Sequence, residues 1–283
     1  MILKKSINAW SFPAEYSFEE CIAAAKKAGF DAVEFNLDAG NAGHAFTMET
    51  TVEEILAVRA LCERYGICPV SISSSLHGGR WAKADEESVA AAMAILEKQL
   101  QIARLMGADT ILLVPGGMSE GITLAVSREN SLRNLRAAIP LIEGSGVTVG
   151  LENVWNGFFL SPYDMLSFLE ELGSPVFSLY FDMGNMIAFS TSAFWCEIVG
   201  KHIAKLHIKD FKRNGGINSG GRFCNLLEGD ADFPAVMAAL KKQGFDGYLT
   251  AEVFRTDEAQ PWGAFFQSVS EAEDTIIDYY NKA

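Results

Sequence analysis

The sequence predicts an α/β fold in which one closed (β/α)8 barrel spans residues 1–283. The first observation is a regular alternation of short apolar runs with amphipathic stretches, which is typical of parallel sheets connected by helices. The second is that eight runs and eight stretches give about 35 residues for each unit, which favours a closed barrel. The third is that no G-x-G-x-x-G pattern follows the first run, which counts against the runner-up, a doubly wound dinucleotide-binding sheet.

The strands are predicted from runs that are rich in β-branched or aromatic residues, as strands buried on both faces should be. We expect them at residues 6–12, 32–37, 69–75, 110–116, 147–154, 177–182, 204–211 and 248–254. Before the last strand lies a polar, glycine-containing segment, residues 212–232. We expect it to be a mobile loop over the mouth of the barrel.

The helices are predicted from apolar residues at helical spacing. We expect them at residues 18–30, 51–66, 88–107, 129–146, 162–173, 194–202, 233–245 and 270–283. The first pattern ends at Gly29. The second opens at Thr51 with a Thr/Glu pattern that resembles a capping box, and it ends at Gly66.

The composition indicates a large apolar core and an acidic surface. The chain is 49% hydrophobic, and its net charge of -13 would repel phosphate backbones, so no nucleic-acid partner is expected. Five cysteines without a C-x-x-C pair predict reduced thiols. No apolar run reaches membrane-spanning length and the first residues have no signal-peptide pattern. We therefore expect a cytoplasmic protein with no membrane partner.

Four ionisable residues stand near the ends of four successive predicted strands: Glu152, Asp182, His207 and Glu252. In a closed parallel barrel, side chains at the C-terminal strand ends converge on one mouth. Three carboxylates and one imidazole there would form a site for a divalent cation. Taken singly, each residue could instead be solvated or salt-bridged. Their matching places in four successive units favour the metal site.

The predicted barrel also suggests a reaction. The fifth and eighth strands face each other across the mouth, so Glu152 and Glu252 would flank a substrate on opposite faces. A metal ion that polarises a ketone and its neighbouring hydroxyl would acidify the adjacent C–H bond and stabilise an enediolate. One carboxylate would remove the proton, and the other would return a proton to the opposite face. This arrangement inverts a carbon next to a carbonyl, or moves the carbonyl if the substrate is shifted along.

The segments that carry these residues resemble a known family. LENVWNGFFLSP, YFDMGN, HIKDF, EGDADF and LTAEVF are similar to xylose-isomerase-like TIM barrels, in particular the sugar and sugar-phosphate isomerase/epimerase group. That group includes ketose 3-epimerases of the tagatose/psicose type and L-ribulose-5-phosphate 3-epimerases. The resemblance covers essentially the whole chain.

The resemblance implies one divalent ion, usually Mn²⁺, with Mg²⁺, Co²⁺ and Zn²⁺ as alternatives. Its implied ligands are Glu152, Asp182, His207 and Glu252, and the implied acid/base pair is Glu152 and Glu252. It also implies a sugar or sugar-phosphate substrate and a homodimer or homotetramer. One departure concerns Asn185, where many family members carry a histidine. An amide can bond a hydroxyl but cannot act as a cation, and this form resembles the sugar-phosphate branch.

Six residues are predicted to contact the substrate: Trp10, Glu34, His77, Asn185, Lys209 and Arg222. Trp10 could stack on a sugar face or pack in the core. Glu34, at the end of the second strand, could bind substrate or form a structural hydrogen bond, and His77, after the third, could bind substrate or be solvated. Lys209 could reach a hydroxyl or phosphate, or pair with a carboxylate. Arg222 could clamp a phosphate or lie on the surface.

The leading functional hypothesis is a metal-dependent 3-epimerase of a ketose or ketose phosphate. A hydroxypyruvate-type aldose–ketose isomerase and an inosose dehydratase are alternatives on the same scaffold. An abasic-site endonuclease is disfavoured, because it resembles a three-metal site rich in histidine and this chain has four histidines. A non-catalytic sugar-binding protein would not need two opposed carboxylates. Metal content separates these classes: about one ion favours the epimerase, about three the nuclease and none the binding protein.

Overall fold

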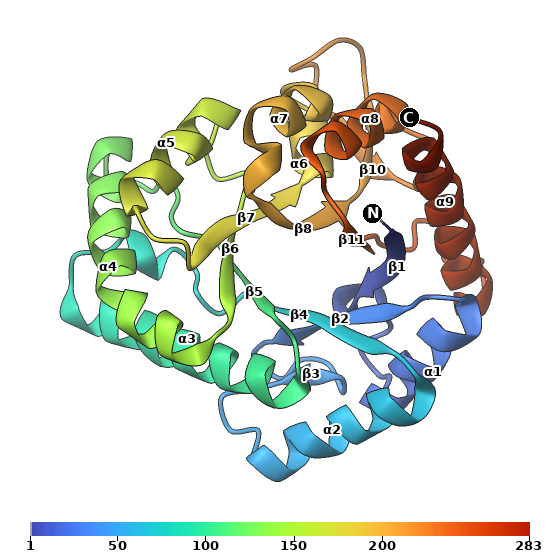
Figure 1. Cartoon of the computed structure of the whole chain (residues 1–283), viewed down its shortest axis with the longest axis horizontal. Coiled ribbons are helices and arrows are strands. Elements are labelled where there is room, and N and C mark those ends of the chain that lie inside the picture. The colour runs from blue at the N-terminus through green and yellow to red at the C-terminus, as the bar shows by residue number, and fades with distance from the viewer. Residues whose placement is uncertain (1) are drawn as a thin grey trace.

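The computed structural model describes residues 2–283, and eight parallel strands within this range form a closed barrel (Figure 1). They are β1 (Leu3–Asn8), β2 (Ala32–Leu37), β4 (Cys68–Ser74), β5 (Thr110–Leu113), β6 (Thr148–Glu152), β7 (Phe177–Asp182), β8 (Ile203–Ile208) and β11 (Gly247–Ala251). The first strand, β1, pairs with both β2 and the last strand, β11, which closes the ring. The predicted barrel is confirmed, and the doubly wound sheet is wrong because such a sheet has open edges.

Helices surround the barrel on its outside (Figure 1). They are α1 (Phe18–Ala28), α2 (Val52–Tyr65), α3 (Glu86–Met106), α4 (Leu124–Ser145), α5 (Pro162–Leu172), α6 (Met183–Ile187), α7 (Ser192–Val199), α8 (Phe233–Gln243) and α9 (Trp262–Lys282), with 3-10 turns η1 (Ala9–Ser11), η2 (Arg80–Ala82) and η3 (Gly200–His202). The capping box expected at Thr51 is present, with Glu54 as its partner. Among residues 2–283, no helix is both long and apolar enough to cross a membrane.

Several predicted boundaries are wrong by three or more residues, and two of these errors have a clear local cause. The first strand spans residues 3–8 instead of 6–12, because the Asn8 side chain accepts a hydrogen bond from Trp10 N and caps the turn η1. The apolar residues after Asn8 therefore belong to this turn and to the segment that follows it. The last helix begins at Trp262, eight residues before the predicted start, and Pro261 precedes it without a side-chain cap. The usual signal for a helix start is absent there.

The segment 212–232 is more ordered than the predicted loop. It contains most of an antiparallel hairpin formed by β9 (Asp210–Arg213) and β10 (Gly221–Cys224). The Asp210 carboxylate anchors the returning chain, since it accepts hydrogen bonds from Gly229 N at 2.8 Å and Ala231 N at 3.1 Å. A further short strand, β3 (Ala45–Phe46), pairs in parallel with the end of β2. Closure of the segment over the mouth stays a prediction.

Candidate metal centre

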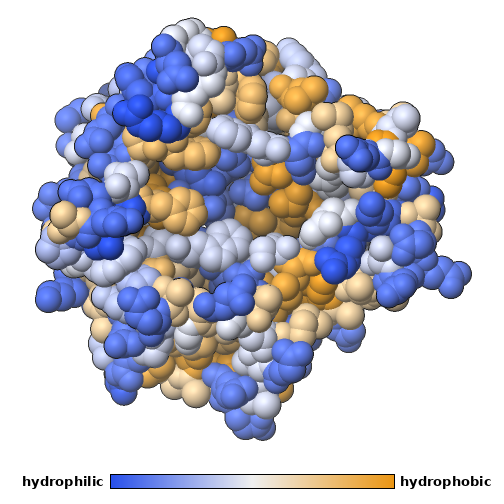
Figure 2. Space-filling model, turned by 180° about the vertical axis from the view of Figure 1, so that it is seen from behind, coloured by the Kyte–Doolittle hydropathy of each residue, from blue (hydrophilic) through white to orange (hydrophobic). Residues whose placement is uncertain are grey.

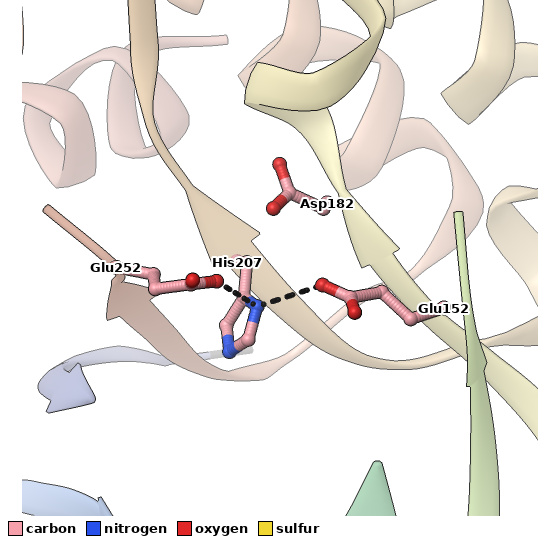
Figure 3. Close-up of side chains that lie close together, drawn as sticks. All are labelled: Glu152, Asp182, His207 and Glu252. Carbon is pink, nitrogen blue, oxygen red and sulfur yellow. Dashed lines mark hydrogen bonds and ion pairs between the residues drawn. The ribbon is translucent and has the colours of Figure 1, made fainter. Parts of the chain in front are cut away.

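The structure brings the four predicted ligands together at the C-terminal ends of four strands (Figure 3). Glu152 and Asp182 are the last residues of β6 and β7, His207 is the last but one of β8, and Glu252 directly follows β11. All four are buried, and one ligand atom from each lies within 4.8 Å of the others. Ligands on opposite sides of a divalent ion, with bonds of about 2.0–2.4 Å, are separated by about 4–4.8 Å. The four side chains could therefore hold one metal ion.

The imidazole of His207 lies between the two glutamates. Its Nδ1 is 2.9 Å from Glu252 Oε2 and 3.3 Å from Glu152 Oε1. Figure 3 shows the two carboxylates approaching Nδ1 from opposite sides. The fifth and eighth barrel strands therefore do present opposed carboxylates, with the candidate metal position between them.

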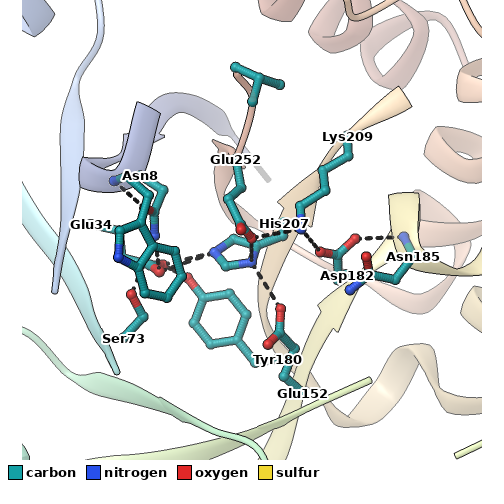
Figure 4. Close-up of polar contacts among 12 residues, drawn as sticks. Asn8, Glu34, Ser73, Glu152, Tyr180, Asp182, Asn185, His207, Lys209 and Glu252 are labelled. Carbon is teal, nitrogen blue, oxygen red and sulfur yellow. Dashed lines mark hydrogen bonds and ion pairs between the residues drawn. The ribbon is translucent and has the colours of Figure 1, made fainter. Parts of the chain in front are cut away.

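The ammonium of Lys209 adds a second cation to the cluster (Figure 4). Its Nζ lies 2.8 Å from Asp182 Oδ2 and 3.0 Å from Glu252 Oε2. Within residues 2–283, Asp182 Oδ2 accepts no hydrogen bond of normal geometry despite this ion pair. The three carboxylates of the centre and the adjacent Glu34 face two cations, Lys209 and a protonated His207. The cluster therefore holds more carboxylates than cations, and a divalent cation that replaced the Nδ1 proton of His207 would offset this excess.

The pKa values of the two glutamates are driven apart. The pKa of Glu152 is raised to about 7, mainly by burial and also by the charges of Glu252 and Asp182, against the opposing contact with His207. Burial also raises the pKa of Glu252, but Lys209 and His207 outweigh burial and lower it to about 2. Burial lowers the pKa of His207, whereas the carboxylates of Glu34 and Glu252 raise it well above its ordinary value. One carboxyl of the pair is thus suited to hold a proton and the other to accept one.

Glu34 lies deeper in the barrel than the sequence suggested (Figure 4). It sits in the middle of β2, three residues before the strand ends, and it is fully buried. Its carboxylate accepts hydrogen bonds from Asn8 Nδ2 at 2.6 Å, from Ser71 Oγ at 2.7 Å and from the Tyr180 hydroxyl. The Nε2 of His207 is 3.1 Å from Oε1. The structure therefore places Glu34 against His207 and does not expose it to a substrate.

Asn185 forms hydrogen bonds to other residues of the site through its side chain and its backbone. Its side-chain Nδ2 donates to the backbone oxygen of Asn153 at 3.0 Å, and its backbone N donates to Asp182 Oδ1 at 2.9 Å. Asn153, which the sequence reading missed, bonds both the backbone O and the backbone N of Asp182, at 2.7 and 2.9 Å. The two amides thereby fix the end of β7. The sequence did offer one signal for Asn153, because an amide that directly follows Glu152 at the end of an apolar strand lies at the barrel mouth.

His77 has both ring nitrogens engaged by buried partners. Trp81 Nε1 donates to Nδ1 at 3.0 Å, and Nε2 lies 3.0 Å from Gln99 Oε1. Burial lowers the pKa of His77 to about 4, so the imidazole is neutral at physiological pH. The structure leaves it no free ring nitrogen for a substrate, and its contacts instead hold the turn after β4 against α3.

Trp10 and Arg222 lie on the segments that follow β1 and β9. The half-buried indole of Trp10 donates to Asp38 Oδ2 at 2.6 Å. Arg222 is exposed on β10, next to Phe223, whose ring stacks on Trp155 at 5.2 Å and receives Lys209 Nζ at 5.7 Å. Because successive side chains of a strand point to opposite faces, Phe223 faces the site and Arg222 faces away. Sequence reasoning missed Phe223, since an aromatic residue in a predicted loop carries no chemical signature.

The face opposite to that in Figure 1 has a hollow near its centre, with hydrophilic residues at its base and apolar ones along its wall (Figure 2). A cavity of 440 Å³ beside the centre is lined mainly by apolar side chains of the β6 and β7 segments, including Val154, Trp155, Leu160, Met186 and Phe189. Two larger grooves, of 580 and 490 Å³, include none of the predicted site residues. The chemistry-bearing residues therefore favour the barrel mouth as the functional site.

Comparison with known proteins places this architecture in a family. Residues 22–272 match the xylose isomerase-like TIM barrels. L-ribulose-5-phosphate 3-epimerase UlaE of Salmonella paratyphi C (strain RKS4594) is 26% identical over 255 residues, which cover 89% of this chain and 87% of that protein. A solved L-ribulose 3-epimerase has a TM-score of 0.80 at 20% identity and covers 99% of this chain and 96% of its own. The IOLI protein with a bound zinc atom has a TM-score of 0.83 at 16% identity, with 98% and 99% covered.

The family match spans most of the chain, so this protein belongs to the xylose isomerase-like TIM barrel family. The likeness to the two solved structures supports the fold, and the family named from the sequence motifs is confirmed.

Proposed function

We propose that this family member is a divalent-metal-dependent enzyme that inverts C3 of a ketose or ketose phosphate, next to the carbonyl. The observation that carries the proposal is the placement of Glu152 and Glu252 on opposite sides of His207 Nδ1, inside one buried group of potential metal ligands. The name of the UlaE relative, a 3-epimerase of a ketose phosphate, supports the same reaction class. Isomerisation would need the same residues and a substrate shifted by one carbon.

The proposed reaction uses the two carboxylates in turn. When bound, the metal ion would supply Lewis-acid polarisation of the substrate carbonyl and its neighbouring hydroxyl. The carboxylate on one face takes the proton from the carbon beside the carbonyl, and the carboxyl on the other face donates a proton to that carbon. Lys209 holds the carboxylates of Asp182 and Glu252 in place. Burial of the cluster keeps bulk water away from the enediolate.

The metal we propose is Mn²⁺, with Mg²⁺, Co²⁺ and Zn²⁺ as alternatives, because three carboxylates and one imidazole suit all four ions. In the described residues, this cluster is the one group of three or more His, Cys, Asp or Glu side chains that could hold a metal. A single cluster supports the epimerase over a three-metal nuclease. The homo-oligomer and the cytoplasmic location stay predictions.

The proposal is tested by incubating the metal-loaded protein in deuterated water with a panel of ketoses and ketose phosphates. NMR should find deuterium at C3, together with the epimeric sugar, and removal of the metal with a chelator should abolish both. Deuterium at C1 or C2 with an aldose product would identify an isomerase. Full activity after complete removal of the metal would contradict the proposal.

The phosphate-clamp role of Arg222 can be tested separately. The guanidinium is exposed on β10 and faces away from Phe223, so it would reach the substrate only if the hairpin closes over the mouth. If the substrate is phosphorylated, Arg222→Ala should raise KM for the ketose phosphate by about tenfold or more, and far less for the free ketose, because a charged hydrogen-bond partner is lost. Equal, small effects on both substrates would make Arg222 a surface residue.

A further inference from the structure

We propose that Glu34 is a positioning residue that fixes which nitrogen of His207 binds the metal. This inference rests on the proposed metal centre and assigns Glu34 a role other than the substrate contact expected from the sequence. The imidazole has two distinct faces in the structure. Its Nε2 points at the Glu34 carboxylate, 3.1 Å from Oε1 and 3.2 Å from Oε2, whereas its Nδ1 points at Glu152 and Glu252.

The geometry determines the tautomer. A carboxylate only accepts hydrogen bonds, so Nε2 must carry a proton to donate to Glu34. Without a metal, Nδ1 also faces carboxylates and carries a proton. A metal ion bound there would replace that proton and leave the neutral tautomer, with its proton on Nε2 and the lone pair of Nδ1 on the metal. A carboxylate on the outer nitrogen of a metal-binding histidine fixes the ring in this way and makes it a stronger ligand.

Glu34 is itself held by donors that belong to the barrel wall (Figure 4). Asn8 Nδ2, Ser71 Oγ and the Tyr180 hydroxyl all point at its two oxygens from β1, β4 and β7. With His207 these donors use the lone pairs on both oxygens, so the carboxylate has one fixed orientation. Glu34 and Tyr180 are completely buried, which removes competing water. The chain thus builds a buried support for a single side chain of the candidate centre.

The test measures metal binding and the tautomer of His207 in the full-length protein. The dissociation constants for Mn²⁺ and Zn²⁺ are determined by competition with a chelator for wild type, Glu34→Gln, Glu34→Ala and Tyr180→Phe. We expect Glu34→Ala to weaken both by about 10- to 100-fold. Glu34→Gln, which keeps a neutral hydrogen-bond acceptor for Nε2, should lose less metal affinity than Glu34→Ala. Tyr180→Phe should also weaken metal binding. Thr250→Val is the matched control, because it changes a buried barrel residue whose hydroxyl makes no hydrogen bond within the described chain, and it should bind metal as wild type does.

The tautomer is read from ¹⁵N NMR of the zinc-loaded protein, in which a His207→Asn variant assigns the signals. Wild type and Glu34→Gln should show a protonated Nε2 and a metal-bound Nδ1, and Glu34→Ala should lose the protonated Nε2 signature. If Glu34→Ala does not fold, Glu34→Gln and Tyr180→Phe still decide the question through their dissociation constants. Unchanged metal affinity in both, or a wild-type Nε2 bound to zinc, would overturn the role of Glu34. Wild type that binds neither ion would instead refute the metal centre on which the inference rests.

Discussion

Glu152→Gln and Glu252→Gln should each slow epimerisation by at least about a hundredfold, the usual scale for loss of a general acid or base. Each glutamine keeps an oxygen that can contact the metal but cannot exchange a proton with the substrate. Steady-state turnover measured in both directions checks the prediction, with metal content determined for each variant. Near-normal epimerisation in either metal-loaded variant would contradict the two-carboxylate mechanism.

A sharper test follows from the placement of the two carboxylates on opposite faces. If each serves one face, a variant that has lost one of them can still remove a proton from the epimer that presents its C–H bond to the other. Each variant should therefore exchange deuterium from solvent into one epimer without inverting it, and the two variants should select opposite epimers. Loss of exchange with both epimers in only one variant would mean that the glutamate removed there acts on both faces. Loss of exchange in both variants would mean that each proton transfer needs both carboxylates or that the metal is lost, and the metal content separates these two cases.

The barrel was predictable because its signals are local and repeated. Buried parallel strands are short apolar runs, and their alternation with amphipathic helices leaves few topologies. The errors occurred where the local signal changes its meaning. After Asn8 the apolar residues Trp10 and Phe12 belong to a turn and its flank, and only the side-chain cap of Asn8 distinguishes them from a strand. The hairpin β9–β10 sits in a polar segment whose glycines suggested a mobile loop.

The candidate metal ligands were predictable because topology alone sends strand ends to one mouth. The residues around them were not, because hydrogen-bond partners depend on side-chain direction and depth. Glu34 and His77 were each predicted to contact the substrate near a strand end. In the structure, the polar atoms of each side chain instead form hydrogen bonds with buried neighbours. Conversely, Tyr180 reads as one aromatic residue of an apolar strand, and its hydroxyl reaches Glu34 across the barrel. Such long-range partners leave no pattern in the sequence.

A buried carboxyl outside the site gives a second large expected effect. Glu273 on α9 is completely buried, and neither of its oxygens accepts a hydrogen bond of normal geometry within residues 2–283, although the nearby backbone amides of Ser6 and Ala251 lower its pKa. The charge of Lys5 also lowers the pKa of Glu273, but the Lys5 ammonium is itself bonded to Asp274 and Ser270, at 2.8 and 2.9 Å. Burial is the larger influence and raises the pKa of Glu273 well above its ordinary value. The folded protein therefore favours the neutral carboxyl.

We expect Glu273→Gln to stabilise the protein at pH 8 by roughly 1–4 kcal/mol, because each pH unit over which only the folded chain keeps the proton costs about 1.4 kcal/mol of stability. The unfolded chain ionises Glu273 above its ordinary pKa of about 4.3, whereas the folded chain keeps the proton until a higher pH. Folding thus takes up a proton, and the wild-type free energy of unfolding should fall as pH rises through this window, by at most about 1.4 kcal/mol per pH unit from this group. Glutamine does not titrate, so the gain should vanish near pH 4.

Urea unfolding between pH 4 and pH 8 measures this difference directly. The matched control is Glu271→Gln, which removes an exposed carboxylate from the same helix and should follow the wild-type profile closely. Because Glu273 lies outside the candidate centre, the variant should keep its metal affinity, so a gain in stability cannot come from the site. Parallel profiles for wild type and Glu273→Gln would mean that the buried carboxyl ionises at the same pH in the folded and unfolded chains. That result would require a further hydrogen-bond donor to the Glu273 carboxylate, such as an internal water. This donor would act in addition to the backbone amides of Ser6 and Ala251, which already lower the pKa of Glu273.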